Sequence, residues 1–179
     1  SMRSRPGAAH RAASITDAPA CRRPPCTTIG AMAKTVPSLT PAQIARAIAA
    51  QIQDTEADLN NHGSADALAV ARRLQGARLA FLEVVAFVAD QTRASPNAVF
   101  AGSVPYLMLA GNLMAGWQLA RALLVAEQRL AAGEDVDFMQ AKITTARFYA
   151  DHILSRVPGL RDSIVDGGDA VMAMALESF

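Results

Sequence analysis

A run of 27 residues, 94–120, contains no charged side chain, and it restricts what this chain of 179 residues can fold into. A run of this length has to be buried, either in a lipid bilayer or among other helices. The bilayer alternative requires a nearly continuous apolar stretch, but polar and helix-breaking residues interrupt this one. They are Pro96, Asn97, Ser103, Pro105, Asn112 and Gln118. We therefore expect no membrane partner, and a central helix that is buried within a bundle or an oligomer.

The composition favours helices over sheet. Alanine accounts for 38 residues, whereas aromatic residues make up only 5% of the chain. Alanine is the best helix former, and strands are usually richer in β-branched and aromatic residues. The formal net charge of +1 gives no reason to expect nucleic acid as a partner. The sequence therefore predicts an all-α protein.

Turn-forming residues predict where the helices begin and end. Thr40 followed by Pro41 is typical of a helix start, and a stripe of Ile44, Ile48, Ile52 and Leu59 follows. The first predicted helix begins at 41 and stops in the turn-forming cluster 60–63, and the second runs from 64 to about 92. The third follows the break at 95–97 and ends near 132, the fourth covers about 137–156, and a short last helix covers 169–177. Pro158-Gly159 is expected to end the fourth. Because short connections place successive helices antiparallel, we expect an antiparallel up-down four-helix bundle with a short C-terminal helix.

Residues 1–39 differ in charge from the rest of the chain. They carry six basic side chains and one acidic one, whereas residues 40–179 carry 11 basic and 15 acidic ones. With few large apolar residues to bury, this segment is expected to be a disordered basic leader or linker sequence. Ser1-Met2 is typical of a cloning remnant, and Met32 is a candidate natural start. Cys21 and Cys26 lack the second pair that a structural zinc site needs, so no metal is expected.

No constellation of catalytic residues is recognisable in the sequence. The three histidines are His10 in the leader, His62 in a turn and His152 on the fourth helix. No serine and acid are placed around any of them, so a Ser-His-Asp site is not supported. Glu83 stands in an apolar string but falls on the polar arc of its helix, and we expect it and His152 to be exposed. We assign no catalytic, cofactor-binding or metal-binding residue.

Lys142 is the least ordinary charged residue of the predicted helices. It falls between Tyr149 and Ile153 in the apolar sector of the fourth helix. A lysine there has to extend to solvent, pair with a carboxylate or reach an interface, so a structural role and an interface or ligand contact both stay open. Arg147 lies on the opposite side, where an ion pair with Asp151, four residues later, accounts for it.

Two sequence blocks carry a resemblance to a known family. The first is VPYLMLAG at 104–111 with AGW at 115–117, and the second is AKITTARFYA at 141–150 with VMAM at 171–174. Together they resemble the C-terminal helical domain of the long bacterial acyl-CoA dehydrogenases. The similarity covers residues 40–179, which are therefore identified as a helical domain of that kind.

The resemblance implies a family of FAD-dependent enzymes that oxidise acyl-CoA thioesters at the α,β-carbons, in fatty acid metabolism in the cytoplasm. In its long members the catalytic glutamate belongs to a Tyr-Glu-Gly-Thr motif that precedes this domain. That motif is not found here, so no catalytic or FAD-binding residue is carried over, and the chain alone is expected to hold no cofactor. The resemblance implies packing on a catalytic core. The alternatives are a free-standing module that partners a separate dehydrogenase core, and an unrelated enzyme or ligand carrier that uses the interior of the bundle as an apolar pocket.

The predicted third helix has more apolar surface than a four-helix bundle needs to bury. One strip of it consists of Tyr106, Leu113, Trp117 and Leu124. We expect this strip to face something other than water and to pair two copies as a homodimer, unless the bundle encloses the helix completely. Small residues on the same helix would let another helix approach closely. They are Gly111, Ala115, Gly116 and Ala120. The candidate interface or ligand contacts are thus this strip and Lys142.

Overall fold

The computed structural model describes residues 39–173 and 177, and all regular secondary structure in this part of the chain is helical. The all-α prediction is confirmed for these residues, whereas the predicted leader, apart from Leu39, lies outside them. The elements are α1 (Pro41–His62), α2 (Ala65–Gln91), α3 (Pro96–Ala101), α4 (Ser103–Ala131), α5 (Val136–His152), the 3-10 turn η1 (Leu154–Arg156), α6 (Val157–Val165) and α7 (Gly168–Met172).

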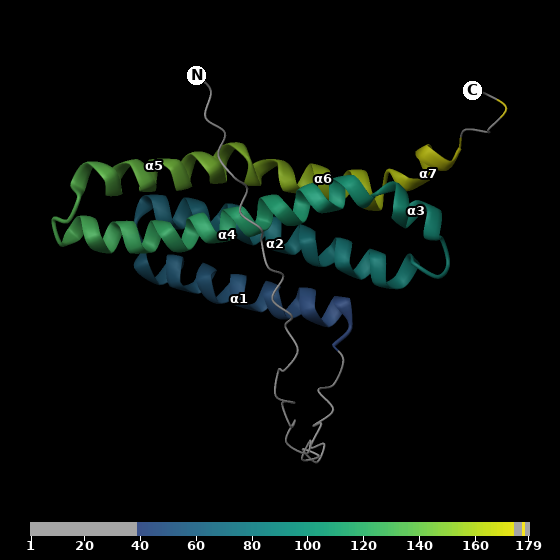
Figure 1. Cartoon of the computed structure of the whole chain (residues 1–179), viewed down its shortest axis with the longest axis horizontal. Helices are drawn as coiled ribbons and strands as arrows, with labels where there is room; N and C mark the ends of the chain where they lie inside the picture. The colour runs from purple at the N-terminus through teal and green to yellow at the C-terminus, as the bar shows by residue number, and fades with distance from the viewer. Residues whose placement is uncertain (1–38, 174–176, 178–179) are drawn as a thin grey trace, which may run out of the picture. The chain divides into compact units, whose positions relative to one another are not determined.

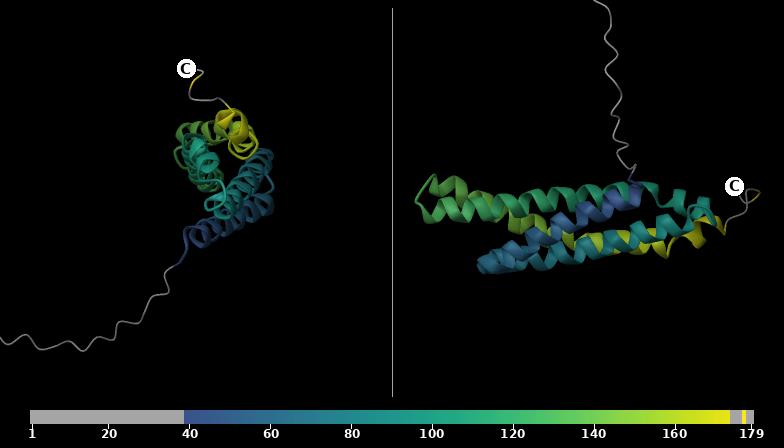
Figure 2. Two further views of the ribbon diagram at one scale, coloured as in Figure 1. Left: turned by 90° about the vertical axis from the view of Figure 1, so that its right-hand side faces the viewer. Right: turned by 90° about the horizontal axis from the view of Figure 1, so that it is seen from below.

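The long helices lie side by side, and the chain reverses direction from one to the next (Figure 1). α1 packs mainly on α2, and α4 on α5, while α2 also contacts α4, α5 and α6. Seen end-on, α4 and α2 lie on opposite sides, with α1 on one flank and α5 and α6 on the other (Figure 2). The long helices therefore enclose one apolar interior.

The predicted boundary between the first two helices is confirmed by its caps. The Thr40 hydroxyl accepts a hydrogen bond from the Gln43 backbone N–H at 3.3 Å, and the Gln43 side chain accepts one from the Thr40 N–H at 2.8 Å. Gly63 ends α1 with φ of 76°, a left-handed conformation that favours glycine. Ser64 then caps α2 by accepting from the Ala67 N–H at 3.0 Å. These local signals define both helix ends.

The interior is filled by aliphatic side chains from all the long helices. Fully buried ones include Ile52, Leu59, Val70, Leu74, Leu109, Leu113, Leu123, Leu154 and Ile164. Ile44, predicted to belong to the same stripe as Ile52, is instead 46% exposed. A spacing of four residues advances by more than one helical turn, so Ile44 is rotated about 80° from Ile52 around α1. The stripe therefore leaves the core toward the N-terminal end of α1.

The predicted third helix is wrong in one respect, because the chain breaks at Gly102 into α3 and α4. A Cβ atom at Gly102 would lie 2.9 Å from the Ile164 side chain, so α6 packs directly on this backbone. The Ser103 hydroxyl donates to the Phe100 carbonyl oxygen at 2.7 Å. Pro105 has no N–H with which to continue the ladder of helical hydrogen bonds. The break thus combines a tertiary contact with local chemistry.

The predicted end of the fourth helix at Pro158-Gly159 is also wrong. α5 ends at His152, the turn η1 follows, and α6 then begins with Pro158 in its first turn. Proline is well tolerated there because the first N–H groups of a helix have no intrahelical partner. Pro158 therefore starts a helix instead of ending one. The predicted last helix corresponds to α7 at Gly168–Met172, and residues 174–176 lie outside the described part.

The uncharged run 94–120 is divided between the interior and the surface. Leu109, Leu113 and Ala120 are fully buried, whereas Val104 and Leu107 are 70% and 72% exposed. Among the described helices, none is both long and apolar enough to cross a bilayer. Burial against the neighbouring helices accounts for one side of the run, and the other side of α4 remains apolar and uncovered by the described residues.

Candidate functional site

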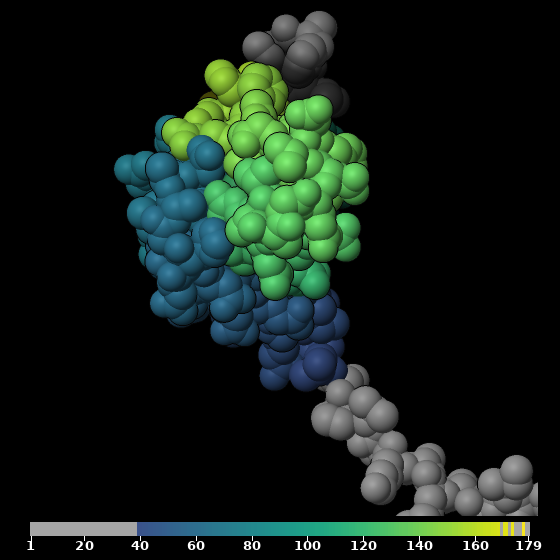
Figure 3. Space-filling view, turned by 90° about the vertical axis from the view of Figure 1, so that its left-hand side faces the viewer, coloured from purple at the N-terminus to yellow at the C-terminus, as the bar shows by residue number. Residues whose placement is uncertain are grey.

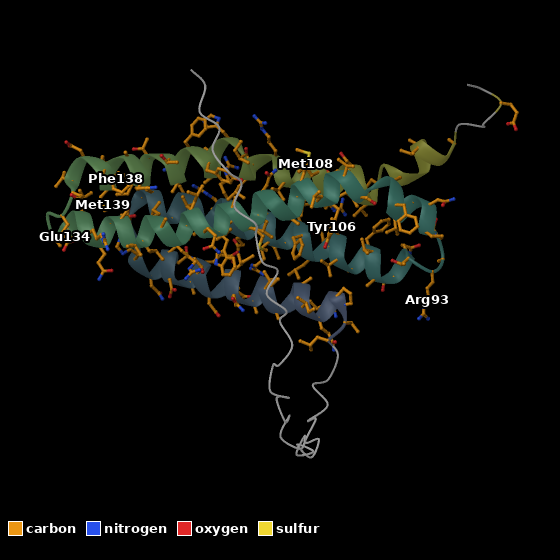
Figure 4. All side chains as sticks on the ribbon, in the orientation of Figure 1. Arg93, Tyr106, Met108, Glu134, Phe138 and Met139 are labelled. Carbon is orange, nitrogen blue, oxygen red and sulfur yellow. The ribbon has the colours of Figure 1, made fainter. Side chains whose placement is uncertain are left out.

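A groove of about 560 Å³ lies between α1, the C-terminal half of α4 and the start of α5. Three cationic side chains line it, Arg121, Arg129 and Lys142, against a single carboxylate, Asp58. The remaining lining residues are Thr55, Gln118, Ala122, Leu124, Val125, Ala126, Phe138 and Met139. We call this the basic groove; Figure 4 shows Phe138 and Met139 near the α4–α5 turn, at one end of the unit. Its charge suits an anionic group more than a cationic one.

Lys142 lies on the surface at the edge of the basic groove. Its Nζ is 5.1 Å from the centre of the Phe138 ring, a distance at which the cation is attracted to the aromatic face. Within the described part of the chain, no carboxylate lies within ion-pair distance of Lys142, Arg121 or Arg129. The long side chain has extended to solvent, as the sequence allowed. A ligand or interface contact by Lys142 stays a prediction.

The predicted apolar strip of α4 faces the interior. Leu113 is fully buried, and the other three members are half-buried and pack on the core: Tyr106, Trp117 and Leu124. The strip therefore packs on the chain's own core, as the alternative of an enclosed helix allows, and its role in pairing two copies stays a prediction. A helix that is apolar on nearly all sides carries no periodic signal for which side faces inward. Leu124 nevertheless reaches the basic groove, and its role as a ligand contact stays a prediction.

Trp117 connects α4 to α1 beside the basic groove. Its Nε1–H donates a hydrogen bond to the Thr55 hydroxyl at 2.8 Å, and Thr55 in turn donates to the Gln51 carbonyl oxygen. The Arg121 guanidinium lies 5.7 Å from the centre of the indole ring. Trp117 is thus held by a hydrogen bond to Thr55 of α1 and by a cation–π contact with Arg121, and both of these residues line the groove.

Tyr106 belongs to a second groove, of about 410 Å³, between the start of α1, the end of α2 and the start of α4. Its ring stacks with Phe81 at a centroid separation of 6.3 Å. The lining is apolar except for hydroxyl groups: Thr40, Pro41, Ala42, Ala45, Val85, Val88, Ala89, Thr92 and Tyr106. Figure 4 places Tyr106 far along the unit from Phe138. This groove suits an apolar group and offers no acid or base for catalysis.

Glu127 contacts both a histidine and a serine. Its Oε2 lies 2.6 Å from His62 Nε2, and its Oε1 accepts from the Ser64 hydroxyl at 2.7 Å. Both side chains therefore contact the carboxylate and not each other, unlike the order in a catalytic triad. The cluster ties the α1–α2 turn to α4, at the end of the unit that faces the viewer in Figure 3. Its geometry is that of a structural cross-link.

Two arginines organise the surface ion pairs. Arg147 donates to Asp151 at 2.6 Å, as the sequence predicted, and to Asp66 at 3.0 Å. The hydrogen bond from Arg147 lowers the pKa of the Asp151 carboxyl below its ordinary value. Arg161 Nε lies 2.6 Å from Oε2 of Glu83, and Glu83 is exposed as predicted. The Asp66 and Arg161 contacts join residues about 80 positions apart and have no local sequence signal.

The remaining candidates from the sequence are His152 and a possible metal site. His152 is exposed and lies on Phe148 with ring centroids 4.4 Å apart. In the described ranges, no group of three or more His, Cys, Asp or Glu side chains could hold a metal ion. Cys21 and Cys26 lie outside those ranges. The arrangement thus offers binding surfaces and does not assemble a reaction centre from the described residues.

Comparison with known proteins places the chain next to one class of enzyme. The family model described as "Acetyl-CoA dehydrogenase C-terminal like" matches residues 45–175. The 3-methylmercaptopropionyl-CoA dehydrogenase of Ruegeria pomeroyi is 42% identical over 132 residues, 74% of this chain and 22% of the relative. The broad-specificity linear acyl-CoA dehydrogenase FadE5 of Mycobacterium tuberculosis is 32% identical over 94 residues, 51% of this chain and 15% of the relative. The chain thus spans less than a quarter of either relative. No solved structure matches it.

Proposed function

Because this chain belongs to the acetyl-CoA dehydrogenase C-terminal-like family, we propose that it is the C-terminal helical domain of an acyl-CoA dehydrogenase and serves packing and assembly. The observation that carries the proposal is the 42% identity to 3-methylmercaptopropionyl-CoA dehydrogenase over 74% of this chain. The match covers 22% of the relative, the proportion expected of one domain beside a larger catalytic part.

In this proposal the complete enzyme oxidises acyl-CoA thioesters with FAD, in cytoplasmic fatty acid metabolism, and this domain supplies neither the flavin site nor the base. The linings of the two grooves described above support that division, because together they include no histidine and a single carboxylate, Asp58, which is exposed to water. A base that removes the α-proton of a thioester works best when its pKa is tuned by a shielded site. The chain alone is then catalytically silent.

The same proposal assigns the helices a mechanical role. The four long segments act as an antiparallel up-down bundle in which α5 and α6 together supply the fourth helix. The bundle packs on the dehydrogenase core, and it associates with a second copy of itself as a homodimer. The apolar face that α4 presents to solvent supports this role, because large exposed apolar surfaces are typical of interaction sites.

Domain exchange with the Ruegeria pomeroyi enzyme tests the proposal. In one chimera, residues 45–175 of this chain replace the matching segment of that enzyme; in a control, the segment is deleted. We expect the deletion to lose assembly and acyl-CoA-dependent reduction of an electron acceptor, and the chimera to retain both. A chimera that behaves like the deletion, or a deletion that behaves like the intact enzyme, would contradict the proposed role.

Adding this chain as a separate protein to the deletion variant distinguishes the alternative. If the separate chain restores assembly and activity as well as the fused one does, the domain works as a free-standing module that partners a separate core. If only the fused form restores them, it works as part of one polypeptide. Gel filtration of the mixture and the rate of acceptor reduction measure the two properties independently.

A further inference from the structure

α4 exposes a continuous face, apolar except for Gln118, that the other described helices leave uncovered. Its members are Val104, Met108, Gly111, Ala115, Gln118, Ala122 and Val125, all exposed to solvent. They follow one another at alternating intervals of four and three residues, the spacing of the a and d positions of a coiled coil, so they form one line along the helix. We call this line the α4 seam. Leu107, 72% exposed, lies beside it.

The presence of glycine at two positions in the middle of α4, 111 and 116, has a different explanation at each. Gly116 is required by the chain's own packing, since a Cβ atom there would lie 2.7 Å from the Leu154 side chain. Gly111 lies on the seam, and a Cβ atom there would meet nothing within 4 Å. Glycine is a much poorer helix former than alanine, so Gly111 weakens α4 without any benefit inside one copy. Gly76 also meets nothing within 4 Å, but Gly111 lies on the seam, where it leaves room for close approach of an external helix.

The α4 seam is complementary to itself when a second copy runs in the opposite direction. With Ala115 of both copies at a two-fold axis, Val104 meets Val125 of the other copy and Gly111 meets Gln118. The large side chain of Met108 meets the small one of Ala122. Such alternation of large and small residues lets two helices interdigitate at the short interaxial distances that small residues permit. The pairing is isologous, as a two-fold dimer requires.

The charges on α4 favour the same direction. Residues 103–120 carry no charge, and the charged residues of the helix, Arg121, Glu127 and Arg129, all lie in its C-terminal part, 121–131. Glu127 is engaged by His62 and Ser64, so the outward charges are the two arginines. A parallel pair would place the arginines of both copies together, whereas an antiparallel pair places each charged end beside an uncharged one. Like-charge contacts are thereby avoided.

We propose that two copies of this chain pair through the α4 seam in antiparallel orientation, with Ala115 at the two-fold axis. The inference deepens the proposed assembly role and rests on it, because it names the surface and the partner through which the domain self-associates. The basic groove borders the seam at Gln118, Ala122 and Val125. Pairing therefore places the start of α4 from one copy beside the basic groove of the other.

A charge at the axis tests the surface. Sedimentation equilibrium of the full chain is expected to give a dimer, and Ala115→Glu to raise its dissociation constant about a hundredfold, because two carboxylates would face each other in an apolar contact. The matched control is Ala47→Glu, at an exposed alanine of α1, which should leave the dissociation constant unchanged. Circular dichroism checks that both variants keep the helical content of the natural chain.

Disulfide trapping tests the direction. In a Cys21→Ser, Cys26→Ser background, Val104→Cys mixed with Val125→Cys should cross-link on oxidation, while Val104→Cys by itself should not. A disulfide needs Cα atoms about 4.4–6.8 Å apart, which only the antiparallel pairing supplies between these positions. Self-cross-linking of Val104→Cys as efficient as that of the mixture would overturn the antiparallel arrangement.

The other outcomes separate this inference from the domain's proposed function. A monomer at high micromolar concentration, or a dimer that Ala115→Glu leaves intact, would overturn pairing through the α4 seam. Neither result bears on the activity of the chimera, which reports packing on the dehydrogenase core. Conversely, a chimera without activity combined with a dimer sensitive to Ala115→Glu would support the seam and contradict the dehydrogenase role.

Discussion

Glu56 and Arg78 form a two-point ion pair inside the packed interface between α1 and α2. The arginine Nε donates to Oε1 at 2.8 Å and its Nη2 donates to Oε2 at 2.9 Å. The side chains are only 6% and 9% exposed. Because both carboxylate oxygens accept hydrogen bonds from one planar guanidinium, the pair fixes the axial register of α1 against α2.

Breaking this pair should be strongly destabilising. Arg78→Met leaves the Glu56 carboxylate buried without its partner, and we expect the free energy of unfolding to fall by about 3–5 kcal/mol. Urea denaturation at neutral pH measures the change. The double variant Glu56→Leu, Arg78→Met removes both charges and should recover most of the loss. A single variant as stable as the natural chain would contradict the inferred role of the pair.

Two helix glycines should respond in opposite ways to alanine. Gly116→Ala places a methyl group 2.7 Å from the buried Leu154 side chain, and we expect a loss of about 1–3 kcal/mol in the free energy of unfolding. Gly76→Ala, in α2, meets nothing within 4 Å and should gain about 0.5–1 kcal/mol from better helix propensity. Chemical denaturation of both variants checks the predicted signs; equal effects would refute the packing explanation for Gly116.

Acid should remove the stabilising effect of Asp151. The pKa of this carboxyl is lowered from 3.8 in the fold, chiefly by the hydrogen bond from Arg147. Such a group stabilises the fold above its unfolded-state pKa, and that contribution is lost as the pH falls through the folded-state pKa. The stability difference between the natural chain and Asp151→Asn should therefore be largest near neutral pH and shrink below about pH 4.

Urea midpoints measured across a pH series test this dependence. Asp90→Asn is the control, at an exposed carboxylate that takes part in none of the ion pairs between described residues. A difference for Asp151→Asn that stays constant from neutral pH down to about pH 2.5 would contradict the prediction.

The purified chain should be colourless and inactive by itself. We assign it no flavin-binding segment and no catalytic carboxylate, so it is expected to leave an electron acceptor oxidised in the presence of any acyl-CoA. The visible absorption spectrum and the acceptor assay measure both properties, with the active chimera as the positive control. A stoichiometric flavin spectrum from the purified chain would show that the domain holds the cofactor.

Local chemistry made much of the fold predictable. The cap at Thr40 and the glycine at Gly63 act within a few residues of themselves, and the structure has both helix ends where the sequence predicts them. The division at Gly102 was not predictable from local chemistry alone, because the Ile164 side chain that packs on this backbone is 62 positions away. Pro158 is compatible both with ending and with starting a helix, and only the turn η1 before it decides between them.

The candidate site was less predictable than the fold. α4 is apolar on most sides, so the sequence shows that part of its surface needs a partner without showing which part. The structure turns Leu113 inward and leaves Val104 and Met108 exposed. The convergence of Arg121 and Lys142 on one groove depends on how α4 and α5 pack, which no single-helix pattern contains.

Trp117 is the single tryptophan of the chain, and its indole N–H is bonded to Thr55 on α1. α1 is held mainly by α2, so its detachment from α4 would free this indole while the remaining helices stay packed. The emission of this fluorophore is therefore sensitive to the junction between α1 and α4. Compared with far-ultraviolet circular dichroism, which averages over every helix, it tells whether the first helix melts together with the others or before them.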